Sequence, residues 1–123
     1  MDSESLILVR AANADLSGFL SEVSGFFPVQ SETVVRLGEI ERQLAALMAT
    51  IQRVGRSIGS VSGEGLDAGS RNEVKQYAGQ LESLRNFMLA LEAYAEERRI
   101  KLLADTRQIS EALAWCDTLK LTR

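Results

Sequence analysis

The chain has no histidine, one cysteine and one proline among its 123 residues. The absence of histidine removes the commonest general acid–base group and the commonest metal ligand. Because Cys116 is the only cysteine, the chain can form neither an internal disulfide nor a cysteine-based metal cluster. Its spacing places it on the apolar side of the last predicted helix, as a small buried hydrophobe rather than a reactive or intersubunit thiol. We therefore expect no enzyme activity, no cofactor and no metal site.

The chain also lacks an excess of positive charge. Its 14 Lys and Arg are outnumbered by 17 Asp and Glu, and neither half carries the basic stripe that binding a polyanion requires. No apolar run approaches the roughly 20 residues that cross a bilayer. The short apolar run 6–9 follows acidic residues rather than the basic residues of an export signal. We expect a cytoplasmic protein that binds no nucleic acid and does not insert into a membrane.

The most informative positive feature is a pair of apolar stripes at helical spacing. Both alternate steps of three and four residues, which keeps their side chains on one face of a helix that packs against a partner helix. The first stripe is Leu37, Ile40, Leu44, Leu47, Ile51, Val54, Ile58 and Val61. The second is Val74, Tyr77, Leu81, Leu84, Met88, Leu91 and Ala95. These stripes predict a long antiparallel, coiled-coil-like helical hairpin.

Glycine and proline divide the chain into three predicted helices. The first spans about 3–24, where its apolar residues recur at helical spacing. The second spans about 31–58, and a glycine-rich loop over about 59–70 lets the chain turn back. The third spans about 70–120. The expected fold is a single all-α domain, 1–123, in which the shorter first helix packs along the hairpin to form an extended three-helix bundle.

The third predicted helix has a clear start and no marked end. Ser70 followed by Glu73 fits a capping box, in which each side chain satisfies a backbone N–H of the first turn. Neither glycine nor proline occurs over 80–123. A helix of about 50 residues is ~75 Å long, whereas a compact domain of this size is on the order of 35 Å across, so either the helix breaks at an unmarked place or the molecule is a rod. In a rod the second helix covers only the first half of the third.

The C-terminal half of this helix carries an apolar stripe displaced from the earlier one, because Arg98 and Asp105 occupy positions that would have continued the heptad. A displaced stripe predicts another partner: the first helix, a second copy of the chain or a different protein. Dimerisation is the simplest way to complete the bundle. Tyr, Trp and Arg dominate interface energetics. The predicted partner-binding surface consists of Tyr94, Arg98, Leu102, Ile109, Leu113, Trp115 and Cys116.

Two other clusters suggest chemistry only at first sight. The glycine-rich loop lacks the Gly-Lys-Ser/Thr ending of a phosphate-binding loop, and Glu64 would repel a phosphate. Glu92, Glu96 and Glu97 lie close together, but no histidine accompanies them and basic residues follow at once. This pattern favours a solvated, charge-balanced helix face.

These patterns predict a non-enzymatic helical interaction protein. It would be an adaptor, an export chaperone or a small structural component that binds a partner protein or a second copy by helix packing. In size, acidic charge and helical layout the chain resembles the export chaperones of flagellar and type III secretion, and no motif carries this likeness. The alternative is a ligand-binding or regulatory bundle, with a small apolar molecule held between helices near Phe87, Met88 and Tyr94.

Overall fold

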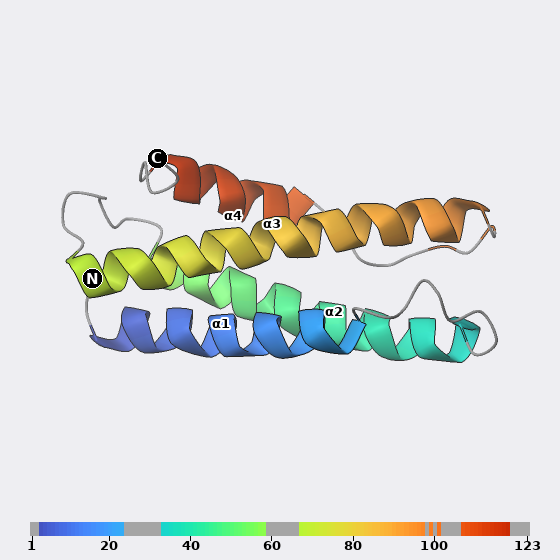
Figure 1. The fold of residues 1–123 in the computed structure, drawn as a ribbon, viewed down its shortest axis with the longest axis horizontal. Coiled ribbons are helices and arrows are strands. Elements are labelled where there is room, and N and C mark those ends of the chain that lie inside the picture. Colours follow the sequence, from blue (N-terminus) through green and yellow to red (C-terminus); the bar gives the residue numbers. More distant parts are fainter. Residues whose placement is uncertain are drawn as a thin grey trace.

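The computed structural model describes residues 3–23, 33–58, 67–97, 99, 101 and 107–118. These residues form four helices: α1 (Ser3–Val23), α2 (Thr33–Ile58), α3 (Ala68–Glu97) and α4 (Arg107–Thr118). The predicted all-α class is confirmed. In Figure 1 the helices lie along one long axis, with α1 and α3 running in one direction and α2 and α4 in the other.

The helices pack as a four-membered bundle. α1 packs against both α2 and α3, and α4 also packs against both of them. α2 and α3 run antiparallel, as predicted, but they lie diagonally across the bundle and their backbones make few close approaches (Figure 1). Their apolar stripes therefore meet in the bundle core, and α1 and α4 fill the two sides between them.

One core cluster draws side chains from all four helices. The predicted stripes form most of it, because every stripe residue whose side chain is described is buried. Two stripe residues are not covered by this statement. Ile58 is the last residue of α2 and its side chain is not described, and Val61 lies outside the described residues. α1 contributes a third buried stripe: Val9, Ala12, Leu16, Phe19 and Val23. Burial of this kind stabilises the fold by about 1.5–3 kcal/mol for each large apolar side chain.

The prediction of one continuous helix over 70–120 is wrong. α3 ends at Glu97, and Arg99 has a φ of 58°, in the left-handed region that a right-handed helix cannot include. The backbone N–H of Arg99 donates to the carbonyl of Glu96 at 3.1 Å, a three-residue step that closes the last turn. α4 then runs back along α3 in the opposite direction (Figure 1).

The displaced stripe provides the physical reason for this break. Ile109 and Cys116 are both 0% exposed, because α4 lies against α2 and α3. A straight helix would have carried these side chains beyond the end of α2. Ile109 alone would then forgo about 1.5–3 kcal/mol of burial. By folding back, the chain buries this stripe against its own α2 and α3, whereas the sequence had left the first helix, a second copy or a different protein as its partner.

α3 also begins with a different cap from the one predicted. The Asp67 carboxylate accepts a hydrogen bond from the backbone N–H of Ser70 at 2.7 Å, as an N-cap residue does. This hydrogen bond holds the pKa of Asp67 below its usual value. Ser70 is buried in the first turn and Glu73 reaches across to α1, so the predicted capping box is wrong.

Candidate functional site

The described members of the predicted partner-binding surface contribute mainly to the core. Ile109 and Cys116 lie inside the bundle, while Leu113 and Tyr94 are half-buried and pack against it. A partner could reach Ile109 or Cys116 only if α4 left the bundle. The remaining predicted members of this surface are Arg98, Leu102 and Trp115. The first two lie outside the described residues, as does the side chain of Trp115.

Cys116 has a second buried polar group beside it, the hydroxyl of Tyr77. Tyr77 is 1% exposed, and its hydroxyl makes no hydrogen bond to any part of the chain that the structure describes. Burial, and to a smaller extent the neighbouring Cys116, raises the pKa of Tyr77. Its hydroxyl therefore stays neutral. The burial of Cys116 agrees with its predicted role as a small core residue.

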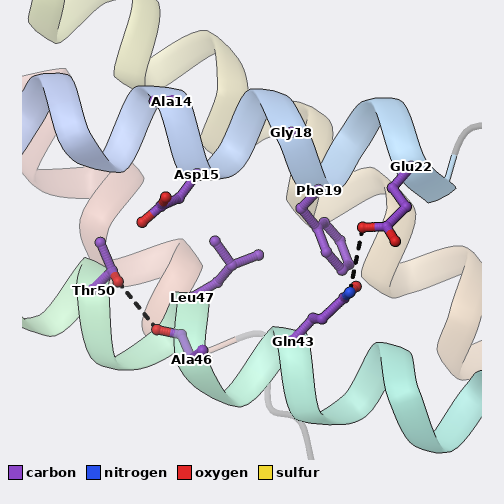
Figure 2. A pocket seen from close by; sticks show the side chains of 9 residues that line it. All are labelled: Ala14, Asp15, Gly18, Phe19, Glu22, Gln43, Ala46, Leu47 and Thr50. Carbon is purple, nitrogen blue, oxygen red and sulfur yellow. Dashed lines mark hydrogen bonds between the residues drawn. The ribbon is translucent and has the colours of Figure 1, made fainter.

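An open groove of about 430 Å³ lies between α1 and α2 (Figure 2). Figure 2 shows α1 side chains reaching toward α2 across this space, with Glu22 turned to meet Gln43. Five lining residues come from α1 and four from α2. They are Ala14, Asp15, Gly18, Phe19, Glu22, Gln43, Ala46, Leu47 and Thr50.

The groove exists because small residues lie above large ones. Ala14, Gly18 and Ala46 line its sides, and a Cβ atom built on Gly18 would meet no atom within 4 Å. Phe19 and Leu47 lie deeper and are only 5% and 6% exposed, so they form an apolar floor. The floor is supported from behind, since Phe87 of α3 packs edge-on against Phe19 with ring centroids 5.7 Å apart.

The edge of the groove is polar and acidic. A carboxylate oxygen of Glu22 accepts a hydrogen bond from the Gln43 amide at 3.3 Å. Asp15 lies two turns earlier on α1, and none of the nine lining residues is basic. Arg53 lies next to one end of the groove, where it donates to the Thr50 hydroxyl at 3.4 Å. The groove thus combines an apolar floor with two carboxylates at its rim.

The opposite side of α1 is closed by polar contacts to α3. Asn13 is 4% exposed, and its amide donates to the Glu73 carbonyl at 3.1 Å and to the Glu73 carboxylate at 3.2 Å. Arg10 forms an ion pair with the same carboxylate at 3.4 Å. The oxygen of the Asn13 amide accepts no hydrogen bond from the described residues. α1 is therefore held to α3 along its first half, and it is also held to α2 where the hydroxyls of Ser5 and Ser57 lie 2.8 Å apart.

The sequence did not indicate this groove. The predicted apolar pocket near Phe87, Met88 and Tyr94 falls on residues that fill or flank the core, with Met88 2% exposed. Gly18 was the only local signal, because a glycine inside a helix costs stability and often marks a close approach or an open space.

The described residues show no metal-binding cluster of three or more cysteine and acidic side chains. None of the described helices is long and apolar enough to cross a membrane. Comparison with protein-family models, with curated proteins and with solved structures gives no match to this chain.

Proposed function

We propose that this protein is a non-enzymatic helical interaction protein that binds a helix of a partner protein in the groove between α1 and α2. The observation that carries the proposal is the groove itself, an open space of about 430 Å³ between two packed helices. A further helix can lie along such a groove, since helices pack by placing the side chains of one between those of its neighbours.

The lining residues support binding rather than catalysis. Beyond its two carboxylates, the groove offers the Gln43 amide and the Thr50 hydroxyl, and that hydroxyl donates to the carbonyl of Ala46 at 3.1 Å. This set lacks the nucleophile with an adjacent base that covalent catalysis needs. Apolar floor and polar rim are the usual composition of a protein interface.

The size and helical form of the chain support a proposal for its biological class. We propose an adaptor, an export chaperone or a small structural component acting in the cytoplasm. The sequence suggested a homodimer because the C-terminal stripe needed a cover. In the structure α2 and α3 cover Ile109 and Cys116 of α4 within one chain. We therefore assign the groove to a different protein rather than to a second copy.

A small apolar ligand is the second candidate function. The volume of the groove falls within the range of small-molecule sites, about 300–1,000 Å³. Such sites bury most of the ligand surface, whereas this groove is open to solvent and suits one face of a helix better (Figure 2). A small hydrophobe that raised the melting temperature of the native chain, but not of Gly18→Leu, would favour the second candidate.

Site-specific photo-crosslinking tests the proposed function in the source cell. A photoreactive amino acid at Ala46 lies in the groove, and one at Ala93 lies on an exposed part of α3 as the matched control. We expect one protein to be crosslinked from Ala46 and not from Ala93. A third position, Leu113, probes the C-terminal surface. Adducts from Leu113 alone, or from none of the three positions, would contradict the proposal.

A further inference from the structure

We infer, resting on the proposed function, that the occupant of the groove is an amphipathic partner helix. It carries two basic side chains two turns apart and an apolar side chain between them. Each part of this description follows from a separate property of the groove: its charge, its spacing and its open centre.

The charge of the groove requires a cationic occupant. Asp15 and Glu22 supply the only charged groups among the nine lining residues. Within the part of the chain that the structure describes, Asp15 has neither an ion pair nor a hydrogen bond. A helix laid over the groove would take this carboxylate out of water, and a buried charge without a partner strongly disfavours binding. Lys or Arg on the occupant compensates that cost.

The spacing of the two carboxylates sets the spacing of the basic residues. Asp15 and Glu22 are seven residues apart on α1, so they lie on one face and about 10 Å apart along the helix axis. A partner helix lying along α1 presents its positions i and i+7 at the same separation. These two positions are where we place Lys or Arg.

The open centre of the groove takes the apolar side chain. Gly18 lies midway between the two carboxylates, and a Cβ atom at this position would meet no atom within 4 Å beyond its chain neighbours and the backbone of its own helix. A residue at i+3 or i+4 of the partner helix shares a face with i and i+7. Its side chain therefore enters above Gly18 and contacts the floor formed by Phe19 and Leu47.

Two features select against other occupants. A second copy docking through the same groove would make a twofold contact, which brings Asp15 and Glu22 of each copy close to the same carboxylates of the other. Like charges that face each other across an interface disfavour association. Arg53 donates a hydrogen bond to Thr50 at the end of the groove where Asp15 lies. Its positive charge repels a further basic residue of the partner helix beyond that end.

Three synthetic helical peptides of about 20 residues test this inference with the full chain. They share one apolar face and carry Lys, Gln or Glu at both i and i+7. We expect fluorescence anisotropy to show the Lys peptide binding about tenfold more tightly than the Gln peptide, and the Glu peptide binding least. Added salt reduces the preference for Lys, because it screens the charges at the rim.

Charge reversal provides the decisive variant. The double variant Asp15→Lys with Glu22→Lys is expected to bind the Glu peptide in preference to the Lys peptide. The control with the same change in net charge is Glu82→Lys with Glu111→Lys, at two exposed positions on α3 and α4. The control keeps the native order of the three peptides. If the variant with both groove carboxylates changed to Lys still bound the Lys peptide most tightly and the Glu peptide least, the inference would be overturned.

Gly18→Leu separates this inference from the proposed function. The added side chain fills the centre of the groove, and Gly79→Leu is the matched control on α3, where a Cβ also meets nothing within 4 Å. If the native chain binds all three peptides equally and Gly18→Leu abolishes that binding, the groove binds helices and only the charge inference fails. If no peptide binds, or if Gly18→Leu binds like Gly79→Leu, both proposals fail.

Discussion

The two sides of α1 differ in how they are packed. Toward α3, Asn13 and Arg10 reach Glu73, and Phe19 packs against Phe87, so polar and aromatic contacts close the interface. Toward α2, Ser5 hydrogen-bonds to Ser57 at 2.8 Å and Glu22 to Gln43, but between these two contacts small residues surround an open groove, and Gly18 leaves its centre empty. Both sides of α1 therefore hold the bundle together, and the middle of the α2 side leaves room for another molecule.

The contrast separates residues that are close neighbours in sequence. Asn13 is 4% exposed and bonded to α3, whereas Asp15, two residues later, lines the groove. Because Asp15 and Gly18 are exposed and the core lies beneath them, changes at these two groove positions are expected to alter binding with little effect on folding.

The largest expected effect comes from the core that both sides share. Leu16→Asp places a carboxylate at a position only 1% exposed, with no partner for its charge. We expect a loss of about 4 kcal/mol or more in the free energy of unfolding, enough to unfold much of the protein. Circular dichroism under urea titration measures this loss. Ile7→Asp, at a position 62% exposed on the same helix, should change stability by about 0.5 kcal/mol or less.

Two opposite exchanges, Asn13→Asp and Asp15→Asn, test the difference between the α3 side and the α2 side of α1 most sharply. Asn13→Asp removes the amide donor and sets a second carboxylate against Glu73, so we expect a loss of about 2–3 kcal/mol at neutral pH. Asp15→Asn changes one groove residue and should stay within about 0.5 kcal/mol of the native chain. Equal losses in the two variants would show that the two sides of α1 are packed alike.

The aromatic contact behind the groove floor should show measurable coupling. In a double-mutant cycle of Phe19→Leu and Phe87→Leu, we expect an interaction free energy of about 1 kcal/mol from the edge-on pair. Thermal and urea unfolding of the four proteins provides the values. Strictly additive losses would mean that Phe87 does not support the floor in solution.

The smallest expected effect is a gain in stability. Gly18→Ala adds a methyl group to open space inside a helix, which should stabilise the fold by about 0.5–1 kcal/mol. Gly79→Ala on α3 should give a similar gain for the same reason. If Gly18→Ala destabilised the protein while Gly79→Ala stabilised it, the groove would be closed in solution.

The helices and most of the core could be predicted from apolar spacing alone. Leu44 and Leu84, at the centres of the two stripes, are both 0% exposed. The length of the predicted third helix allowed for a break, but its position could not be predicted, because no glycine or proline marks it and Arg99 takes up a left-handed conformation that its residue type rarely adopts. The shift of the apolar stripe near Arg98 indicated only that the buried helix face changes there.

The groove could not be predicted because it depends on how α1 meets α2. Gly18 and Ala46 are nearly 30 positions apart in the chain, and no local pattern shows that they face the same space. The first helix was predicted to pack along the hairpin, and α1 does contact both α2 and α3. The open space along its contact with α2 is what the pattern of apolar residues did not predict.

The most direct test of the groove is to map the binding of the Lys peptide on the backbone amides of the full chain by NMR. The largest shifts are predicted at Gly18 and Ala46, with smaller ones along the groove and little change at Leu113 on α4. Largest shifts on α4, or no shifts at all, would contradict the proposal that the protein binds its partner between α1 and α2.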